Sequence, residues 1–416
     1  MTAAETVEVA PVSSGLKWRG DIVVVGAGIV GLAVAREWLI RNPGTRLMVL
    51  DKEPEIAAHQ SGHNSGVIHS GIYYTPGSLK ARACVAGAAR MMTYCDEHEI
   101  PYRLCGKMII ATEEEELPRL EALFERGQAN SVPGLEMIEA GRLKEIEPHA
   151  VGLKAIWSPK TGIVDYRLVA KSYAGEIERS GGEIQTSTEV LGFEQRGDAT
   201  LVSTTRGDFE TSLVVTCGGL WADRLAQLSG GDREPVIIPF RGDYFTLPPD
   251  RRHLVQTNIY PVPDPQFPFL GVHLTPRMNG EVWLGPNAVL AFARAGYSFP
   301  TVNFKDLVDT VRSRGFRKFA RMHWRTGLDE TRRDLSRRRF LASLQKFIPE
   351  LELSDLHPGP SGVRAQALSS DGKLVDDFVL DREGRTLHVR NAPSPAATSS
   401  LEIGRMIADE LEKMPS

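Results

Sequence analysis

A glycine-rich turn between a short apolar run and a helical stretch constrains this chain more than any other feature. Residues 21–25 are typical of a buried strand, Gly28 to Arg41 have the composition of a helix, and Arg46 to Leu50 predict a second strand. The turn that joins the first strand to the helix is Gly26-Ala27-Gly28-Ile29-Val30-Gly31. This order predicts a β-α-β unit with parallel strands, in which the helix N-terminus presents free amides to phosphates.

Each glycine of the turn has its own role in binding a dinucleotide. Gly26 allows the tight turn, Gly28 lets the backbone approach the pyrophosphate, and Gly31 lets the helix pack closely on the strand. Asp51, 20 residues after Gly31, ends the second strand, where its carboxylate can accept hydrogen bonds from ribose hydroxyls and would repel a 2′-phosphate. The predicted dinucleotide contacts of this unit are Gly26, Ala27, Gly28, Ile29, Gly31, Asp51 and Lys52. FAD and NAD are equally compatible with them.

A second polar, glycine-rich segment distinguishes between these two cofactors. It reads Gln60-Ser61-Gly62-His63-Asn64-Ser65-Gly66-Val67-Ile68-His69-Ser70-Gly71-Ile72-Tyr73-Tyr74. A nicotinamide dehydrogenase has no need of such a segment directly after its first β-α-β unit. An FAD enzyme does, because the long cofactor runs across the sheet edge towards its isoalloxazine ring. The segment therefore favours FAD, with predicted contacts from Gln60, Ser61, Asn64, Ser65 and Gly66.

The same segment resembles the family of D-amino acid oxidase, glycine oxidase and glycerol-3-phosphate dehydrogenase. Its particular residues are similar to those of the L-2-hydroxyglutarate dehydrogenase branch of that family. The resemblance covers roughly residues 20–410. Other stretches that share it are 106–109, 161–166, 239–244, 260–265, 269–273, 284–288 and 394–400.

The patterns and the resemblance together imply an α/β fold. They predict an FAD-binding Rossmann-like domain with a parallel sheet, and an α+β substrate domain with a mainly antiparallel sheet. We expect a discontinuous FAD-binding domain over 20–85, 160–235 and 360–416, a substrate domain over 86–159 and 236–359, and a flexible N-terminus over 1–19.

The C-terminal part of the resemblance has its own physical logic. Residues 394–400 form a Ser/Pro loop that leads into a predicted helix from about Thr398 to Lys413. A helix N-terminus beside the flavin stabilises the negative charge that develops at N1 and the C2 carbonyl on reduction. The loop at 217–221 belongs to the same region, and Gly218 stands where relatives usually carry alanine. The further predicted FAD contacts are Val190, Gly218, Gly219, Ala397 and Thr398.

The resemblance implies FAD-dependent oxidation of L-2-hydroxyglutarate to 2-oxoglutarate. A hydride would pass to flavin N5, and the electrons would go on to oxygen or a quinone. This chemistry needs a cation for the substrate carboxylate, a base for the hydroxyl proton, and a second cation or donor set for the distal carboxylate.

Arginine, histidine and tyrosine residues in the family-like stretches are the candidates for these tasks. The predicted catalytic residues are His69, His273 and Arg364, because imidazole titrates near operating pH and Arg364 resembles the arginine that relatives place beside the flavin. The predicted substrate-binding residues are His63, Tyr73, Tyr74, Arg241, Tyr260 and Arg277. Which histidine is the base stays open at this stage.

Two other functions stay open. One is a related amine or amino-acid oxidase similar to glycine oxidase. The other is a flavin-binding redox module without catalysis, against which the loop rich in His and Tyr counts.

Composition limits which partners and redox or metal sites can be expected. A net charge of -4 gives no reason to expect a nucleic-acid partner. The four cysteines (Cys84, Cys95, Cys105 and Cys217) form no C-x-x-C pair, so no metal site or dithiol centre is predicted, and four buried thiols in a reducing cytoplasm fit.

The chain shows neither a secretory signal nor a membrane span. The first 19 residues lack a positive region followed by an apolar one, and no apolar run approaches the roughly 18 residues of a spanning helix. Residues 301–350 hold 13 Lys and Arg against 6 Asp and Glu. This is typical of a solvated helical face or, alternatively, of a patch that docks on an anionic membrane surface or a redox partner. We expect a cytoplasmic protein, with peripheral contact at the inner face of the cell membrane as the sharper alternative.

Overall fold

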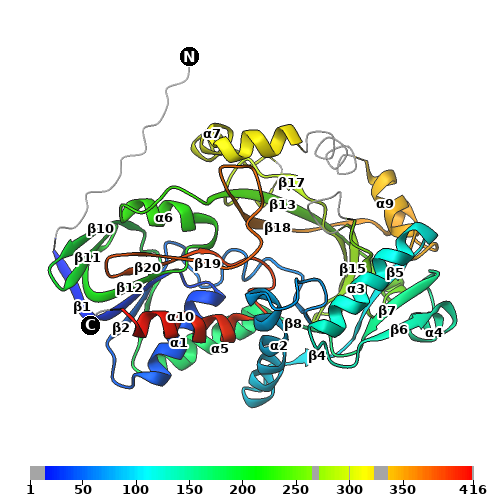
Figure 1. The fold of residues 1–416 in the computed structure, drawn as a ribbon, viewed down its shortest axis with the longest axis horizontal. Helices are drawn as coiled ribbons and strands as arrows, with labels where there is room; N and C mark the ends of the chain where they lie inside the picture. The colour runs from blue at the N-terminus through cyan, green and yellow to red at the C-terminus, as the bar shows by residue number, and fades with distance from the viewer. Residues whose placement is uncertain (1–14, 265–270, 299, 323–335, 415–416) are drawn as a thin grey trace.

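The structure is a computed structural model that describes residues 15–264, 271–298, 300–322 and 336–414. Two large sheets occupy the two halves of the molecule, and the chain passes between them repeatedly (Figure 1). The predicted α/β class is confirmed, because one half is built on a parallel β-α-β core and the other on a mainly antiparallel sheet.

The first sheet contains eight strands of the described chain. Its main order is β10 (Val190–Arg196), β11 (Ala199–Thr204), β12 (Gly207–Thr216), β1 (Leu16–Val25), β2 (Leu47–Leu50) and β9 (Glu183–Gln185), with β20 (Thr386–Asn391) beside β12 and β19 (Val379–Glu383) beside β20. The pairs of β1 with β12 and β2, of β2 with β9, and of β12 with β20 are parallel. Strands β10, β11 and β19 join through antiparallel pairs.

Both faces of this sheet are buried, as parallel strands require. Along β1, Ile22 and Val24 belong to the core on the helix side, whereas Val23 and Val25 belong to the core on the other side. The helices of the first core are α1 (Ile29–Arg41), α2 (Leu79–Glu97), α5 (Tyr166–Arg179) and α10 (Ser400–Glu412). Helix α6 (Ala222–Leu228) lies on the opposite face (Figure 1).

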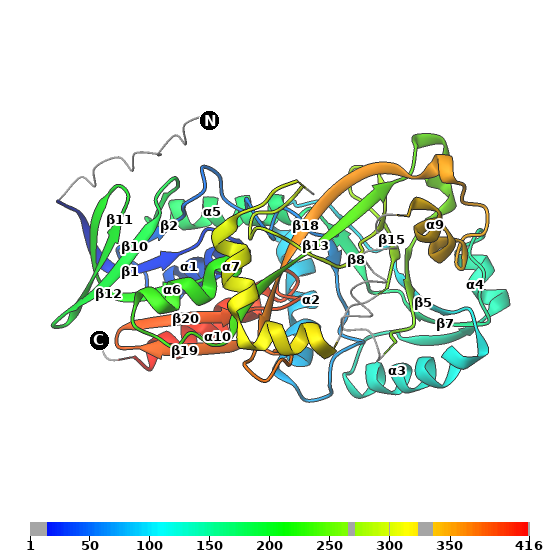
Figure 2. The same ribbon diagram turned by 90° about the horizontal axis from the view of Figure 1, so that it is seen from above.

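The second sheet contains nine strands of the described chain. Its order is β17 (Val289–Leu290), β13 (Val236–Thr246), β16 (Val282–Gly285), β15 (His273–Pro276), β14 (Asn258–Pro261), β5 (Lys107–Ala111), β7 (Lys154–Ser158) and β6 (Glu136–Glu139), with β18 (His357–Leu368) beside β13. Every pair is antiparallel except β14 with β5. Strands β13 and β18 are long and pair over most of their length, and Figure 2 shows them reaching from the centre of the molecule into the second half.

Smaller elements complete the described chain. A third sheet joins β3 (Val67–Ile68), β8 (Gly162–Val164) and β4 (Tyr102–Arg103). Further α-helices are α3 (Leu117–Ala129), α4 (Ala140–Ile146), α7 (Phe304–Arg312) and α9 (Arg337–Gln345), and residues 314–322 are also helical. Short 3-10 turns cover Glu114–Glu116, Gly219–Trp221, Pro249–Leu254 and Leu353–Asp355.

Three elements cross the boundaries that were expected between the segments of the chain. Strand β1 begins at Leu16, inside the N-terminal segment expected to be flexible, because Trp18 and Arg19 pair with β12; residues 1–14 lie outside the described chain. Helix α2 crosses the expected limit at residue 85, and Ala88 and Met91 pack in the first core. Strand β18 lies in the second sheet although residues from 360 onward were expected in the FAD-binding domain.

Two further expectations concern the thiols and the membrane. Cys84 and Cys95 are buried, whereas Cys105 and Cys217 are only partly buried, so the prediction of four buried thiols is wrong for two of them; all four are free. Within the described ranges, no helix has both the length and the apolar character that crossing a bilayer requires.

Candidate active site

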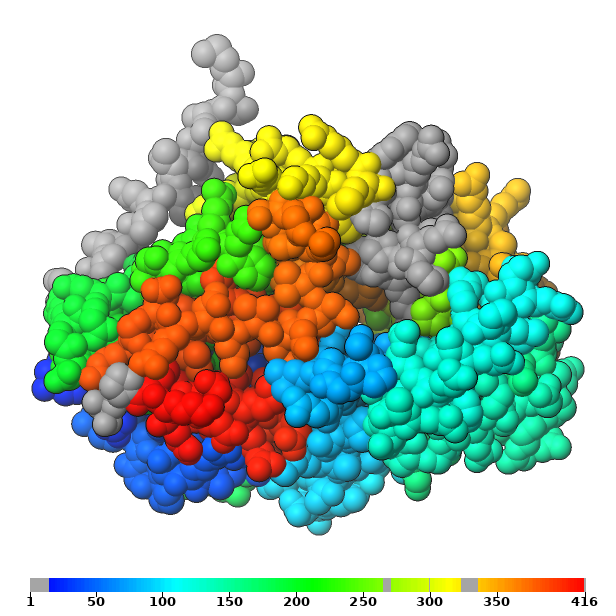
Figure 3. All heavy atoms as spheres, in the orientation of Figure 1, coloured from blue at the N-terminus to red at the C-terminus, as the bar shows by residue number. Residues whose placement is uncertain are grey.

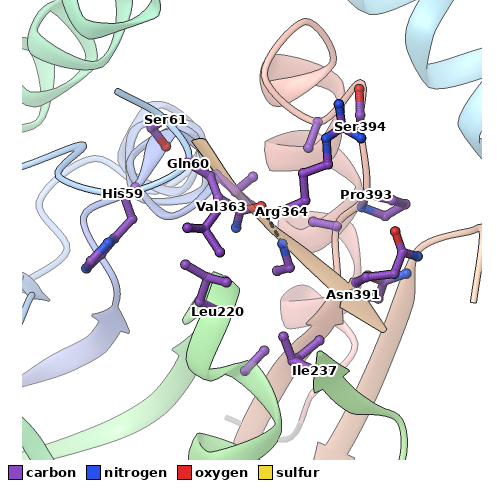
Figure 4. Close-up of a pocket in the computed structure, with 18 of the residues that line it drawn as sticks. His59, Gln60, Ser61, Leu220, Ile237, Val363, Arg364, Asn391, Pro393 and Ser394 are labelled. Atoms are coloured by element: carbon purple, nitrogen blue, oxygen red, sulfur yellow. Dashed lines mark hydrogen bonds between the residues drawn. The ribbon is translucent and has the colours of Figure 1, made fainter. Parts of the chain in front are cut away.

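A cavity of about 1500 Å³ lies between the two large sheets. It is lined by the turn after β1, the end of β2, the loop that follows residue 58, strands β14, β15 and β18, and the loop before α10. Figure 4 shows part of it, with Gln60 and Ser61 on one side and Arg364, Pro393 and Ser394 on the other. We call the part around Gly26, Gly28 and Asp51 the nucleotide end, and the part around His69, His273 and Arg364 the reactive end.

The nucleotide end is shaped by the glycine turn. Gly26 has a φ of 112°, a left-handed conformation that only glycine adopts easily, and a Cβ on Gly31 would stand 1.9 Å from the Gly26 carbonyl oxygen. Gly26, Gly28 and Ile29 line the cavity, whereas Ala27 and Gly31 lie behind them. The N-terminus of α1 therefore faces the cavity, and Gly28 itself contributes no side chain there.

Asp51 holds the glycine turn in place as well as lining the cavity. Its Oδ2 accepts the Ala27 N–H at 2.6 Å and its Oδ1 accepts the Glu53 N–H at 2.8 Å. Burial raises the pKa of Asp51. Lys52 lines the cavity beside it, with Nζ 3.8 Å from the ring centroid of Trp221, and Val190 at the start of β10 closes this end.

The second glycine-rich segment is held by its own polar side chains. Ser61 Oγ accepts the Ile29 N–H at 2.9 Å, and Asn64 binds the carbonyls of Gln60 and Ser61 while accepting the Gly66 N–H. The Gln60 Oε1 accepts the Ala365 N–H at 3.0 Å, the hydrogen bond drawn in Figure 4. All the predicted contacts of this segment, Gln60, Ser61, Asn64, Ser65 and Gly66, line the cavity.

The C-terminal loop reaches the same cavity. Ala397 and Thr398 line it, as do Gly218 and Gly219 on the other side. Helix α10 begins at Ser400, two residues later than predicted, because Thr398 still belongs to the turn. The Thr398 hydroxyl lies at hydrogen-bond distance from Tyr166 Oη (2.9 Å), the His69 N–H (3.1 Å) and the Val67 carbonyl (3.2 Å), so it ties three segments together.

The reactive end brings together residues far apart in the sequence. Those that line it are His69, Tyr73, Tyr74, Tyr260, His273 and Arg364. Figure 4 shows the Arg364 side chain extending from β18 towards Ser394. The Tyr73 hydroxyl is buried and forms no hydrogen bond with the described part of the protein, so it is a donor available to a ligand.

His273 is held as a neutral imidazole. Its Nδ1 lies 3.0 Å from the Gly271 carbonyl, which can only accept, so Nδ1 carries the proton and Nε2 keeps a lone pair. The ring stacks on Tyr260 with centroids 4.1 Å apart. Burial is the main cause that lowers the pKa of His273 to about 3, and the nearby Arg364 and Lys107 lower it further.

Three of the candidate substrate residues are placed differently from the rest. Arg241 does not line the cavity, because its guanidinium pairs with the carboxylate of Asp243 at 2.9 and 3.0 Å. Arg277 also lies outside it, over the Trp283 ring and against Gly66. His63 lines the cavity, but its ring stacks on Tyr297 and its Nδ1 contacts the Ser361 carbonyl.

Sequence reasoning missed two lysines at the reactive end. Lys80 on α2 lines the cavity, pairs with Asp376 at 2.7 Å, and lies 4.9 Å from the Tyr74 ring centroid. Lys107 on β5 is buried behind His69, with Nζ 3.4 Å from His69 Nδ1. Lys107 lies in one of the stretches that resemble the family, 106–109, and this could have identified it as a site residue. Nothing in the sequence indicated Lys80, because a lysine in a helix is ordinarily a surface residue.

The geometry fits an extended dinucleotide. The cavity is continuous from Val190 past the N-terminus of α1 to Thr398 and His273. A family model described as FAD dependent oxidoreductase matches residues 21–410. The chain belongs to this family. FAD is therefore its cofactor, as the second glycine-rich segment predicted, and the protein is an oxidoreductase.

Curated relatives that match nearly the whole chain share one name. The chain is 53% identical to the mitochondrial L-2-hydroxyglutarate dehydrogenase of Nematostella vectensis, over 94% of this chain and 90% of the relative. It is 50% identical to that of Homo sapiens (94% and 89%) and 46% identical to the L-2-hydroxyglutarate dehydrogenase of Indibacter alkaliphilus (94% and 98%). The resemblance seen in the sequence is thus confirmed.

Two solved structures have the same fold. L-alpha-glycerophosphate oxidase from Mycoplasma pneumoniae, a structure with FAD bound, matches with a TM-score of 0.77 at 21% identity over 95% of each chain. Glycine oxidase from Geobacillus kaustophilus matches with a TM-score of 0.71 at 18% identity over 96% of each chain. At such identities the likeness concerns the fold alone, and it confirms a Rossmann-like domain joined to a substrate domain.

Proposed function

We propose that this protein oxidises L-2-hydroxyglutarate to 2-oxoglutarate. The observation that carries the proposal is the lining of the reactive end. Arg364, the Tyr73 hydroxyl, which has no partner among the described residues, and two histidines whose pKa values are lowered by burial line one cavity. The names of relatives at 46 to 53% identity support the same substrate. FAD, when bound, accepts a hydride from the substrate carbon.

The residues of the reactive end divide the remaining tasks. Arg364 binds the carboxylate next to the reacting carbon, since a guanidinium pairs with a carboxylate through two parallel hydrogen bonds. The Tyr73 hydroxyl donates to the same group, because it has no partner among the described residues. The imidazole of His69 or His273 accepts the hydroxyl proton, and Tyr260 holds the His273 ring by stacking.

The distal carboxylate of the diacid needs a second set of cations. Lys80 and Arg126 both line the cavity near the tyrosine pair, and Arg126 donates to the Tyr73 carbonyl at 3.2 Å. We assign this role to them in place of Arg241 and Arg277, which do not line the cavity. The Tyr74 ring beside Lys80 excludes water from that side of the ligand.

Anaerobic titration of the purified yellow protein tests the substrate. L-2-hydroxyglutarate should bleach the visible flavin absorbance stoichiometrically, and D-2-hydroxyglutarate should not, because its hydrogen points away when both carboxylates are bound. Bleaching by glycine or sarcosine instead would indicate an amine oxidase. Flavin that no hydroxy acid or amine reduces would indicate a non-catalytic redox module.

For the electron acceptor and the location, we propose a membrane quinone and a peripheral position at the inner face of the cell membrane, with the protein itself cytoplasmic. The supporting feature is a row of exposed apolar side chains on α7, Phe304, Val308 and Val311, spaced so that they share one helix face. Phe304 is 80% exposed. In Figure 3 this yellow segment forms the upper edge of the face shown.

The charges around α7 are complementary to an anionic lipid surface. Its two acids point inward, since Arg224 pairs with Asp306 and Asp309 at 2.7 Å. Exposed cations lie in the same stretch of chain, namely Lys305, Arg312, Arg314, Arg317 and Arg321. Residues 323–335 of the basic region lie outside the described chain.

Vesicle sedimentation tests this position. The protein should pellet with vesicles containing phosphatidylserine and not with pure phosphatidylcholine, and the triple change Phe304→Ser, Val308→Ser, Val311→Ser should abolish pelleting. Ile40→Ser, which removes from α1 an apolar side chain about as exposed as Val311, is the control. Reoxidation of the reduced protein by a soluble quinone should be much faster than by air; the reverse order would identify an oxidase.

A further inference from the structure

Lys107 is a buried lysine without an acidic partner. It is 1% exposed, and within the described ranges no Asp or Glu forms an ion pair with it. Its Nζ lies 3.4 Å from His69 Nδ1, 4.3 Å from the Tyr260 ring centroid and 5.2 Å from the Tyr73 ring centroid. Burying an ammonium without a carboxylate is costly, so a group in this position calls for a role other than stability.

His69 stands between this lysine and the cavity. The His69 ring lines the cavity whereas Lys107 does not, and the ring nitrogen that faces Lys107 is Nδ1. Nε2 is therefore the nitrogen that remains for a ligand. The His69 backbone is fixed on both sides, because its N–H donates to Thr398 Oγ1 and its carbonyl accepts from Cys84. The His69 imidazole therefore connects Lys107 to the cavity by a polar contact.

We propose that His69 and Lys107 take up the substrate hydroxyl proton together, with His69 as the contact and Lys107 as the final acceptor. The proposal deepens the proposed function and rests on it. His69 is the catalytic residue, since it meets the substrate, and Lys107 is a positioning residue that acts through it. His273 then binds and orients the hydroxyl group from its own side of the cavity.

The step balances in protons and electrons. The substrate O–H bond breaks as the hydroxyl proton bonds to Nε2 of His69, while the Nδ1 proton of the same ring moves to the lone pair of a neutral Lys107. The electron pair of the O–H bond forms the second bond of the carbonyl, and the hydride of the C–H bond goes to FAD. The imidazole stays neutral throughout, and the positive charge ends on Lys107.

The surroundings make Lys107 the group that titrates in the working range. Burial lowers the pKa of Lys107 to about 8, with Cys84 and Cys105 opposing that shift. Burial moves the pKa values of its neighbours away from the working pH range. It raises the pKa of Cys84 to about 12, and it also raises the pKa values of Cys105, Tyr73 and Tyr260. It lowers the pKa of His273 to about 3. Lys80, another cation near His69, is paired with Asp376.

The rate of anaerobic flavin reduction by L-2-hydroxyglutarate, measured from pH 6 to 10, tests the proposal. In the wild type the rate should rise with pH and level off above a midpoint near 8, because only neutral Lys107 accepts the proton. Lys107→Met should reduce the rate about 100-fold at pH 8 and remove that midpoint. Lys107→Arg keeps the charge but stays protonated, so it should be as slow as Lys107→Met.

Lys80→Met is the control, because this lysine also lines the cavity but has its ion pair with Asp376. It should weaken substrate binding and keep the midpoint near 8. A Lys107→Arg variant that reduces FAD at nearly the wild-type rate would overturn the proposal, since a fixed charge would then suffice.

A second measurement needs no turnover. In the FAD-loaded protein labelled with ¹⁵N-histidine, and with the His69 signals assigned through His69→Asn, the ring should change tautomer near pH 8 without becoming charged. Below the midpoint, Lys107 donates to Nδ1 and Nε2 carries the proton; above it, Nδ1 does. Lys107→Met should abolish the change, and an unchanged tautomer in the wild type would contradict the proposal even if the substrate assignment holds. If instead L-2-hydroxyglutarate fails to bleach the wild type, the proposed function fails while the tautomer result still stands.

Discussion

The two ends of the cavity are built in different ways. The nucleotide end comes almost wholly from one β-α-β unit, and its shape depends on backbone and on missing side chains at Gly26, Gly28 and Gly31. The reactive end is assembled from a loop, three strands of the second sheet and the loop before α10, and its properties depend on buried polar side chains. A local motif can therefore specify the first end, whereas the second exists only once the sheets have come together.

The largest expected effect lies at the nucleotide end. Gly31→Val should abolish FAD binding and destabilise the protein by more than about 3 kcal/mol, because its Cβ would stand 1.9 Å from a backbone oxygen that cannot move aside. The ratio of flavin to protein absorbance and the thermal midpoint measure both effects. Gly175→Ala in α5, where a Cβ meets nothing within 4 Å, is the control and should keep FAD with equal or higher stability. A fully yellow Gly31→Val protein would refute the account of the turn.

At the reactive end, the expected effect is on turnover instead of cofactor binding. Arg364→Met should lower kcat/KM about 100-fold with FAD retained, because the substrate carboxylate loses its bidentate partner. Arg241→Met, outside the cavity, should change kcat/KM less than about 10-fold and instead lower stability by about 1–3 kcal/mol, because the Asp243 carboxylate loses this partner. Steady-state kinetics and thermal unfolding separate the two; equal losses of kcat/KM would contradict the assignment.

The reactive end should also be the acid-sensitive one. The folded-state pKa of His273 is lowered to about 3 by burial, below the value near 6.5 in the unfolded chain. The unfolded chain therefore binds the proton first, so the stability contribution is complete above pH 6.5 and is lost as pH falls towards 3. Between pH 7 and pH 5.5, the free energy of unfolding should therefore fall by about 1 kcal/mol more in the wild type than in His273→Asn, as unfolding measurements at both pH values can show. An identical pH dependence in both proteins would show that His273 is protonated in the folded state.

The smallest effect is expected at Gly218. A Cβ there would stand 2.4 Å from Leu225 Cδ1, the end of a flexible side chain that can turn away. Gly218→Ala should therefore keep FAD, with the dissociation constant changed less than about 3-fold, as flavin fluorescence can measure. Loss of the cofactor would mean that the nucleotide end has no room for a Cβ at position 218, although Leu225 could turn away.

The sequence predicted strands β1 and β2 of the first sheet, the helix α1 between them and the cofactor, because their signals are local. The strand at 21–25, the turn and Asp51 lie within about thirty residues, and the turn works through backbone geometry that any such stretch adopts. Predictions that depended on long-range pairing did less well. Strand β18 belongs to the second sheet because it pairs with β13, and nothing in residues 357–368 alone indicates that partner.

The residues of the candidate site were also predicted only in part. Six of the predicted substrate-end residues line the reactive end, but Arg241 and Arg277 do not, because Asp243 and Trp283 hold them elsewhere. Lys80 and Lys107 were missed, since a lysine in a helix or at a strand start is ordinarily solvated. Their burial follows from the packing of α2 and β5 against the loop that carries His69.

The order of the residues by itself determined the β-α-β unit, the use of FAD and the family, since a glycine turn needs only its neighbours along the chain to take its shape. Tertiary structure alone decided which arginine faces the cavity and which cations lie behind a histidine. The physical reason is that the charge state and reach of a side chain depend on what is packed around it, and packing brings separate elements together, as where Lys107 on β5 meets His69 in the second glycine-rich segment.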